Sequence, residues 1–306
     1  MAKILLATEK PFAPAAVEGI QKICDDAGFE LVKLEKYTSH DQLISAVADV
    51  DAIIFRSDNI DKAVIDAGKN LQIVVRAGAG YDNVDLGAST EKGVCVMNTP
   101  GQNSNAVAEL GIGMMIYLNR NGYNGTAGTE LRGKTFGFHA YGYISRVMSH
   151  IGRGLGMTLS AHDPYVDKIN IENDGVKCVE KVEDLYKSCQ YIATNLPANS
   201  QTKGIINYKL LSLMPKGATI VNTARKEIID ESSLLKMFED RPDFRYITDV
   251  APDCKDVIAE KYPGRYFWTP KKMGAQTAEA NINAGLAAAR QIIGYIKDGD
   301  DTFKVN

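Results

Sequence analysis

The chain has 306 residues, a formal net charge of −3 and a hydrophobic content of 45%. These values are typical of globular proteins and exclude a disordered or fibrous chain, and at about 100–200 residues per domain they predict two domains. The acidic balance disfavours nucleic-acid binding, which relies on an excess of Lys and Arg. The five cysteines are widely spaced without a C-x-x-C motif, so we predict neither a disulfide framework nor a metal site.

The sequence contains no pattern typical of a membrane span or an export signal. The first apolar run, residues 4–7, is short and ends at the charged Glu9 and Lys10, so it predicts a buried strand. No uninterrupted apolar stretch approaches the length of about 18 residues that a spanning helix needs. We therefore expect a cytoplasmic protein that acts without a membrane partner.

Short apolar runs alternate with helical patterns in the first third of the chain. We predict strands at 4–7, 30–34, 52–55, 72–75 and 94–97, and helices at 15–27, 41–47 and 62–67. The strands are continuous apolar runs rather than alternating ones, which is typical of parallel sheets that are covered on both faces.

A helical pattern at 105–118 and a glycine-rich loop at 119–133 precede a second alternating set. Its predicted strands are 135–140, 158–161, 191–194, 219–221 and 246–248; helices are predicted at 147–155 and, last in the chain, at 278–296. The whole pattern predicts an α/β fold with two doubly wound parallel-sheet domains.

The segment 134–146 lies where a dinucleotide-binding turn would lie, between a predicted strand and a predicted helix. The three glycine positions of G-x-G-x-x-G are occupied by Ala140, Gly142 and Ser145. Gly142 would let the backbone approach a pyrophosphate. The first position needs a tight turn, which alanine can form if its φ is negative, and Ser145 would widen the helix–strand packing slightly.

Asp163 ends the next predicted strand, 21 residues after Gly142. A carboxylate at this distance accepts hydrogen bonds from an adenosine ribose and repels a 2′-phosphate, so the segment favours NAD over NADP. For this segment taken alone, an ordinary βαβ turn is the alternative.

The chain as a whole resembles the D-2-hydroxyacid dehydrogenase family. Five blocks follow the family's order and spacing: RAGAGYDNVD (76–85), NTPGQN (98–103), LRGKT (131–135), NLP with TKG (195–204), and MPKGA with VNTAR (214–225). The block TPKKMGAQT (269–277) has lysine where most members have histidine, and it resembles the short-form subgroup of D-3-phosphoglycerate dehydrogenases. This short-form subgroup lacks a regulatory domain, and we expect that a chain of 306 residues leaves no room for one.

The resemblance implies a Rossmann nucleotide domain, residues 99–275, inserted into a discontinuous flavodoxin-like substrate domain, 1–98 plus 276–306, with a cleft between them. It further implies a homodimer and NAD-dependent oxidation of D-3-phosphoglycerate to 3-phosphohydroxypyruvate, the first step of serine biosynthesis, by hydride transfer from C2. Two alternatives stay open. One is a glyoxylate or hydroxypyruvate reductase of the same family, and the other is a non-catalytic, NAD-sensing interaction protein on the same fold.

This reaction needs a cation that holds the substrate carboxylate and polarises the forming carbonyl. Arg225 fits, because its planar guanidinium grips a carboxylate with two hydrogen bonds and stays charged. It follows a predicted strand, at the edge where open α/β sheets bind ligands. Lys226 follows it where the family usually has glycine, and an ordinary surface arginine is the alternative.

The family's base is a histidine, but none of the four histidines lies in the matching block, where Lys271 stands beside Lys272. Lys271 could act as a base only if its pKa fell far below about 10.4, and otherwise it could act as an acid toward a keto substrate. A solvated lysine pair is the alternative.

Strict counting puts Cys254 at the position of the family's orienting glutamate. We predict Asp253 as the acidic partner, although an ordinary loop aspartate fits equally well.

The family match also predicts that Asp249 binds the nicotinamide carboxamide. The other predicted cofactor-binding residues are Tyr141, Gly142, Tyr143, Ile144, Asp163, Leu196, Pro197, Thr202, Thr223 and Ala224. The substrate, a small phosphorylated 2-hydroxy acid, would bind to Arg225 and Lys271. Its phosphate would meet further cations and amides from Arg56, Ser57, Arg76, Ala77, Gly78 and Asn103, the last at a helix start that favours anions.

Overall fold

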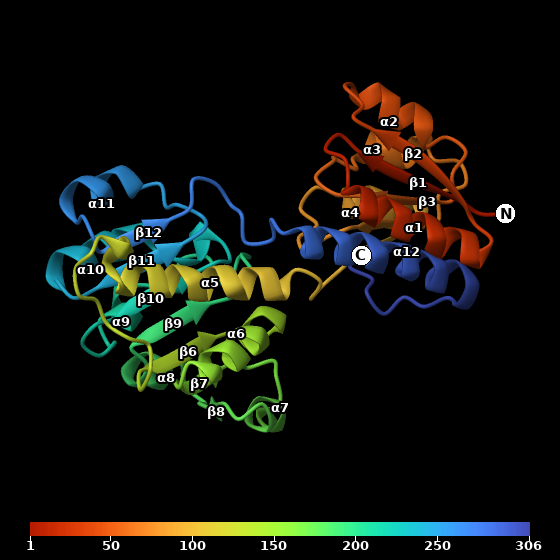
Figure 1. Cartoon of the computed structure of the whole chain (residues 1–306). Helices are drawn as coiled ribbons and strands as arrows, with labels where there is room; N and C mark the ends of the chain where they lie inside the picture. Colours follow the sequence, from red (N-terminus) through yellow and green to blue (C-terminus); the bar gives the residue numbers. More distant parts are fainter. The chain divides into compact units, whose positions relative to one another are not determined.

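The structure is a computed structural model that describes all 306 residues. The chain forms two compact units, the first made of Met1–Asn103 and Ala275–Asn306 and the second of Ser104–Gly274. The second unit is therefore an insertion into the first (Figure 1). The chain leaves the first unit at Asn103 rather than at residue 98, because the Thr99 N–H still donates to the Gly78 carbonyl of that unit at 3.0 Å.

The first unit is built on a five-stranded parallel sheet with the order β2-β1-β3-β4-β5. Its strands are β1 (Lys3–Thr8), β2 (Glu30–Glu35), β3 (Ala52–Phe55), β4 (Ile73–Arg76) and β5 (Cys95–Asn98). This is the flavodoxin-like order, in which the point where the strand order reverses lies between β1 and β3. The predicted class of this domain is confirmed.

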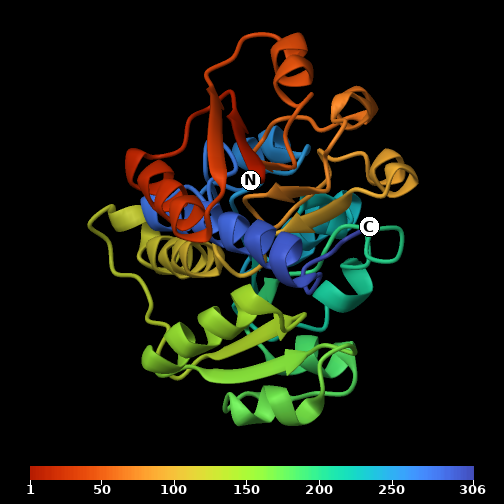
Figure 2. The same ribbon diagram turned by 90° about the vertical axis from the view of Figure 1, so that its right-hand side faces the viewer.

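Helices cover both faces of this sheet because successive strand residues point to opposite sides. Ile4, Leu6 and Ile54 pack under α1 (Pro14–Ala27) and α12 (Ala278–Asp298), which lie side by side in Figure 2. Leu5 and Ile53 face the opposite side, which is covered by α2 (His40–Ala46), α3 (Lys62–Ala67) and α4 (Leu86–Lys92). The last helix of the chain thus completes the core of the first unit.

The second unit holds a seven-stranded parallel sheet with the order β12-β11-β10-β9-β6-β7-β8. The strands are β6 (Thr135–His139), β7 (Thr158–His162), β8 (Lys177–Cys178), β9 (Tyr191–Thr194), β10 (Thr219–Asn222), β11 (Arg245–Thr248) and β12 (Tyr266–Trp268). Counted within the unit, the first six follow the Rossmann order 3-2-1-4-5-6, and β12 is added at one edge. The strand order reverses between β6 and β9, which is where ligands bind in such sheets.

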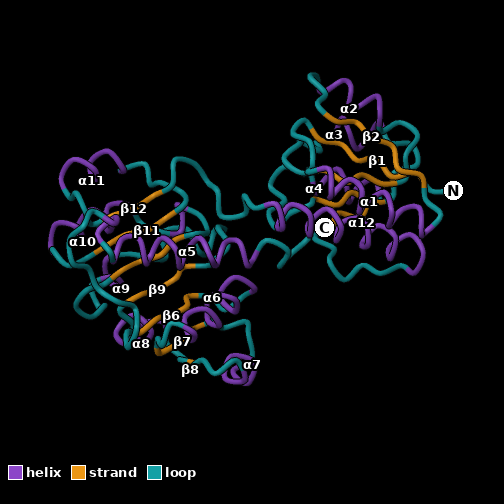
Figure 3. The backbone as a smooth tube through the Cα atoms, viewed as in Figure 1, coloured by secondary structure: helices purple, strands orange, loops and turns teal.

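Helices also cover both faces of the second sheet, and Figure 3 distinguishes these helices (purple) from the strands (orange). One face carries α5 (Ser104–Asn119), α6 (Tyr143–Gly154) and α7 (Lys168–Asn173), and the other carries α8 (Val182–Ser188), α9 (Tyr208–Leu211), α10 (Glu231–Asp240) and α11 (Lys255–Lys261). Two short 3₁₀ turns, Asn121–Tyr123 and Lys226–Ile228, complete the elements. No helix has the length and apolar character required to cross a membrane.

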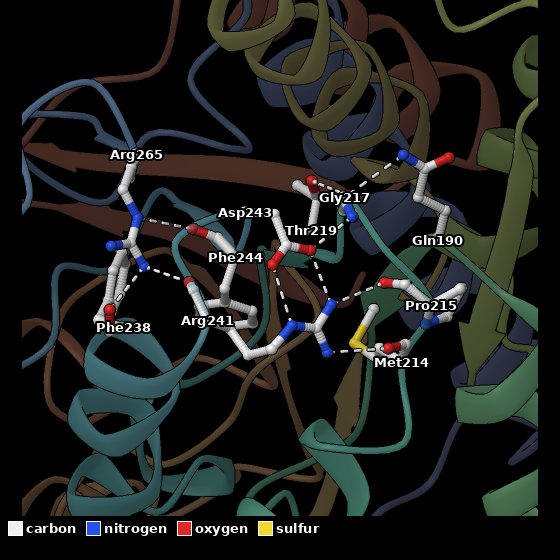
Figure 4. A network of polar contacts seen from close by, with 10 residues as sticks. All are labelled: Gln190, Met214, Pro215, Gly217, Thr219, Phe238, Arg241, Asp243, Phe244 and Arg265. Atoms are coloured by element: carbon white, nitrogen blue, oxygen red, sulfur yellow. Dashed lines mark hydrogen bonds and ion pairs between the residues drawn. The ribbon is translucent and has the colours of Figure 1, made fainter.

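Two arginines tie together the loops at the amino ends of β10 and β11 (Figure 4). Arg241 donates to both oxygens of Asp243, at 3.0 and 2.7 Å, and to the carbonyls of Met214 and Pro215. The Asp243 carboxylate also accepts the Gly217 N–H at 2.7 Å. Arg265 binds the carbonyls of Phe238, Arg241 and Phe244. This network occupies the amino ends of the strands, whereas open α/β sheets bind ligands at the carboxyl ends.

Candidate active site

The turn between β6 and α6 consists of Ala140, Tyr141 and Gly142. Ala140 has a φ of +78°, so the turn does not meet the condition of a negative φ under which the sequence allowed an alanine here. Residues with a Cβ adopt this left-handed region at a cost of about 1 kcal/mol, which is why glycine is usual there. The Ala140 N–H donates to the carbonyl of His162 at 3.0 Å, and this bond fixes the turn against the end of β7.

Polar side chains from helix α6 and from the loops after β9 and β10 form a chain of hydrogen bonds to the turn. The Ser145 hydroxyl is fully buried and donates to the Ala140 carbonyl at 2.7 Å. Asn195, which follows β9, donates from Nδ2 to Ser145 Oγ at 2.9 Å. Thr223, which follows β10, donates from Oγ1 to Asn195 Oδ1 at 3.4 Å. The ends of β6, β9 and β10 are thus joined by side-chain hydrogen bonds at the position where the strand order reverses.

Within the turn, the Tyr141 side chain points into the core, whereas Gly142 lies at the surface. Tyr141 is fully buried, and its hydroxyl contacts Ser149 and Asp174. Gly142 is exposed, and a Cβ added there would meet no atom within 4 Å. At the start of the 12-residue helix α6, the N–H groups that follow have no partner within the helix. Gly142 therefore opens onto free space beside a helix N-terminus, an arrangement that suits a phosphate.

Asp163 follows β7, the strand beside β6. Its Oδ2 accepts the Tyr141 N–H at 2.7 Å, and its Oδ1 accepts the Tyr165 N–H at 2.8 Å. Each oxygen has a second lone pair that these bonds leave unused. The structure therefore brings the predicted ribose-binding carboxylate into contact with the predicted phosphate-binding turn.

Asp249 follows β11 and is 1% exposed. Its Oδ2 accepts the N–H groups of Gly274 at 2.8 Å and of Met273 at 3.3 Å, whereas Oδ1 is buried without any hydrogen-bond partner. Burial raises the pKa of this carboxyl, although the Gly274 N–H and the charge of Lys272 oppose the rise. A buried acceptor without a partner fits a ligand that carries an amide donor, as the predicted carboxamide does.

Arg225 and Lys272 meet at one backbone oxygen. Arg225 Nη1 donates to the Ala224 carbonyl at 3.0 Å, and Lys272 Nζ lies 3.4 Å from the same oxygen. Lys271 contributes its carbonyl to the Thr269 hydroxyl at 2.7 Å, while its exposed side chain forms no hydrogen bond or ion pair. Of the two lysines, the structure brings Lys272 to Arg225 and not the predicted Lys271.

Asp253 lies at the surface, with its side chain 75% exposed. Its carboxylate pairs with Lys226 at 2.5 Å, so its partner is not Lys271. Glu231, at the start of α10, accepts the backbone N–H groups of Asp253 and Cys254 at 2.6 and 3.0 Å. Burial and Glu231 raise the pKa of the Cys254 thiol to about 12. Sequence reasoning missed Glu231, because no motif connects it to a loop that lies 22 residues later.

The loop after β9 carries Leu196, Pro197 and Thr202. The Thr202 hydroxyl donates to the Pro197 carbonyl at 2.5 Å, and the Asn199 N–H donates to that hydroxyl at 2.9 Å. These bonds close the loop on itself beside Asn195. The three predicted residues therefore belong to one folded segment at the carboxyl edge of the sheet.

In the first unit, Arg56 follows β3 at the reversal point of the strand order. Its Nη2 donates to Asn281 Oδ1 of α12 at 2.5 Å, its guanidinium lies 5.2 Å from the Phe12 ring, and no carboxylate forms an ion pair with it. Burial lowers the pKa of this guanidinium, and Asp58 opposes the shift. Sequence reasoning missed Asn281, which is 225 residues away.

Arg76 is the last residue of β4 and donates from Nε to the Arg56 carbonyl at 3.0 Å. Its guanidinium lies over Gly78, where a Cβ would come within 1.7 Å of Nη1. Gly78, which has a φ of +152°, is therefore required for this conformation of Arg76. Of the remaining predicted substrate residues, Ser57 is exposed, Ala77 is buried with its N–H bonded to the Phe55 carbonyl, and Asn103 immediately precedes α5.

The fold and these polar groups at the strand ends define a two-unit α/β protein of the dinucleotide-binding class. The family model for the D-isomer specific 2-hydroxyacid dehydrogenase catalytic domain matches residues 5–306. The chain therefore belongs to the D-isomer specific 2-hydroxyacid dehydrogenase family.

Relatives with assigned names include two kinds of enzyme. The chain is 33% identical to the D-3-phosphoglycerate dehydrogenase of Pongo abelii over 307 residues, a match that covers 94% of this chain and 56% of that protein. It is 31% identical to the hydroxypyruvate reductase of Thermotoga maritima over 290 residues, which covers 86% and 90% of the two chains. The chain thus spans little more than half the length of the Pongo abelii phosphoglycerate dehydrogenase, and it likewise covers 54% of the one from Methanocaldococcus jannaschii.

Among solved structures, the chain is similar to NAD+-bound 3-phosphoglycerate dehydrogenase from Entamoeba histolytica. The TM-score is 0.86 and the sequence identity is 47%, and the match covers 100% of this chain and 98% of that one.

Proposed function

We propose that this chain catalyses the NAD-dependent interconversion of D-3-phosphoglycerate and 3-phosphohydroxypyruvate. The observation that carries the proposal is the meeting of Arg225 and Lys272 at the Ala224 carbonyl, at the carboxyl end of the Rossmann sheet. The similarity to the NAD+-bound enzyme of Entamoeba histolytica supports it. A pure NAD sensor would have no use for two cations beyond the dinucleotide-binding turn.

The residues of the second unit fit an NAD molecule. The N-terminus of α6 would hold the pyrophosphate and Asp163 the adenosine ribose, and the unpartnered Oδ1 of Asp249 would accept the carboxamide N–H. When bound, NAD supplies the nicotinamide ring that accepts or donates the hydride. The protein contributes binding, orientation and charge.

Arg225 and Lys272 would have different roles toward the substrate, Arg225 in binding and charge stabilisation and Lys272 in proton transfer. Arg225 would grip the carboxylate with its planar guanidinium and stabilise charge on the carbonyl oxygen at C2. Lys272 would give a proton to that oxygen during reduction and remove it during oxidation. We propose Lys272 for this role in place of Lys271, because only the ammonium of Lys272 reaches the Ala224 carbonyl.

The first unit would bind the substrate phosphate through Arg56 and Arg76. Both arginines stand at strand ends, and Asn281, a neutral residue, holds the Arg56 guanidinium in place without neutralising it. Because no carboxylate pairs with Arg56, its guanidinium is suited to a phosphate, with which it can form bidentate hydrogen bonds.

Reduction of unphosphorylated hydroxypyruvate or glyoxylate is the second candidate function. The observation in its favour is the Thermotoga maritima relative, because the match extends over 90% of that protein. The two functions differ in whether the substrate phosphate contributes to binding.

The test follows NADH absorbance with 3-phosphohydroxypyruvate, hydroxypyruvate and glyoxylate at matched concentrations. We expect kcat/KM to be at least about 100-fold higher for the phosphorylated substrate, since two arginine–phosphate contacts of about 1.5–3 kcal/mol each would be lost without it. Equal or higher kcat/KM with hydroxypyruvate would favour the second candidate. No turnover of any 2-keto acid, with NAD still bound in a calorimeter, would favour the sensor.

Three further parts of this assignment are proposals of the same kind. They are a homodimer, a cytoplasmic location and a role in serine biosynthesis. Light scattering on the purified chain tests the first, because a dimer has about twice the 33.4 kDa of one chain. Complementation of a serine auxotroph tests the last, and growth without added serine is the expected result.

A further inference from the structure

We propose that Ser145 is a positioning residue that holds Ala140 at its positive φ and thereby keeps the start of α6 in place for the pyrophosphate. The inference rests on the proposed binding of NAD. The sequence departs from the glycine pattern twice, with alanine at the first position and serine at the third. On this proposal the serine compensates for the strain that the alanine introduces.

The contact between the two residues is direct. Ser145 Oγ is 2.7 Å from the Ala140 carbonyl oxygen and is fully buried, so water does not compete for this bond. A serine hydroxyl has one proton to donate. Asn195 Nδ2 donates to the hydroxyl oxygen at 2.9 Å, which leaves that proton for the Ala140 carbonyl.

Both ends of the Asn195 amide are hydrogen-bonded. Thr223 Oγ1 donates to Asn195 Oδ1 at 3.4 Å, and the amide nitrogen faces Ser145. The Asn195 N–H donates to the His139 carbonyl at 3.1 Å, so the backbone of this residue is tied to the end of β6 as well. These bonds form a continuous chain from Thr223 through Asn195 to Ser145, and the last bond of the chain is made to the strained Ala140.

The consequence for a ligand follows from the position of Ala140 in the turn. It immediately precedes Tyr141, whose N–H donates to Asp163, and Gly142, which opens onto free space at the start of α6. An alanine released from φ +78° would relax toward a negative φ, and this rotation would move both residues. Glycine at the first position would keep the same φ without side-chain support.

The experiment is a double-mutant cycle on the full chain, with the Kd of NAD measured by calorimetry and the melting temperature measured in parallel. We expect Ser145→Ala to weaken NAD binding about tenfold, the size of one lost buried hydrogen bond. Ala140→Gly alone supplies the reference Kd for a turn whose first residue needs no side-chain support. The Ala140→Gly/Ser145→Ala double variant should bind within about twofold of Ala140→Gly, because glycine needs no support.

Ser89→Ala is the matched control, since the Ser89 hydroxyl is also fully buried and donates to a backbone carbonyl, that of Asp85 at 2.7 Å in the first unit. It should lower the melting temperature without changing the Kd. If Ser145→Ala does not fold, Ser145→Cys retains the shape with a weaker donor, and weakened binding is again expected.

Unchanged NAD affinity in a folded Ser145 variant would overturn the positioning role while leaving the proposed function intact. So would a loss of affinity from Ser145→Ala that is equally large with and without the Ala140→Gly substitution. A wild-type chain that does not bind NAD would overturn both the positioning role and the proposed function.

Discussion

The side-chain nitrogen of Lys272 lies 3.4 Å from the backbone carbonyl oxygen of Ala224. This contact distinguishes Lys272 from the adjacent Lys271, which has the same side chain. The same carbonyl accepts Nη1 of Arg225 at 3.0 Å, and the charge of Lys272 also acts on the buried Asp249 carboxyl. The exposed side chain of Lys271 has no comparable contact. Which lysine carries the proton is therefore a question of position rather than residue type.

Lys272→Ala should lower kcat for reduction of 3-phosphohydroxypyruvate by about 100-fold or more, the usual contribution of a positioned acid or base. Lys271→Ala is the matched control and should change kcat less than about threefold, because its ammonium is solvated. Steady-state NADH kinetics on both variants make the comparison, and small primary amines should partly restore Lys272→Ala. The assignment is wrong if the larger loss, or the amine rescue, belongs to Lys271→Ala.

Arg56→Ala should raise the KM for 3-phosphohydroxypyruvate by about 10- to 100-fold, since a hydrogen bond to a charged group contributes about 1.5–3 kcal/mol. The KM for hydroxypyruvate should stay within about twofold, because that substrate has no phosphate for Arg56 to bind. Lys62→Ala removes another cation of the first unit, one that pairs with Asp66 on α3, and serves as the control. An equal rise in KM for both substrates would mean that Arg56 supports the fold and not the phosphate.

Hydrophobic patterning predicted the strands better than the short helices. Runs such as 52–55 are continuous apolar segments in the sequence, and the structure forms β3 over the same residues. Helix α4 was missed because LGASTEK has few apolar residues. Its signals were at the ends, where the Asp85 side chain accepts the Ala88 N–H and Gly93 closes the helix with a positive φ. Strand β12 was missed because a half-buried edge strand of three residues has no clear period.

Site residues could be predicted from the sequence where the end of a strand fixes their position. They could not be predicted where the site depends on contacts between side chains that are distant in the sequence. Gly142 and Asp163 follow the neighbouring strands β6 and β7, so their spacing was informative. The bond of Ser145 to Ala140 depends on a positive φ that alanine rarely adopts. Asn281 reaches Arg56 across 225 residues, a separation that no local pattern spans.

Asp243→Ala should lower the free energy of unfolding by about 2 kcal/mol at neutral pH, the size of a charge-assisted hydrogen bond left unmade. The Arg241 guanidinium and the Gly217 N–H, which hold the pKa of this carboxyl well below its usual range, would both lose their acceptor. Asp66→Ala breaks an exposed pair on α3 and should cost less than about 0.5 kcal/mol. Urea unfolding measures both, and equal effects would show that the Arg241 network is not stabilising.

Acid should destabilise the second unit through His139. Burial is the main cause that lowers the pKa of this imidazole from 6.5 to about 4, the neighbouring His162 adds to the shift, and Asp163 opposes it. The unfolded chain therefore takes up a proton at a higher pH than the folded chain does. The contribution of neutral His139 is fully present above pH 6.5 and is lost as the pH falls toward 4.

The His139→Phe/Tyr186→Phe variant removes the imidazole together with its hydroxyl partner, which lies 3.1 Å away, so that no buried polar group is left alone. Between pH 7 and pH 4, its free energy of unfolding should fall by about 3 kcal/mol less than that of Tyr186→Phe, which keeps the histidine. Urea titrations across this range give both curves, and the other titrating groups cancel in the difference. Parallel curves would show that His139 is protonated equally in the folded and unfolded chains, and that its burial does not couple folding to pH.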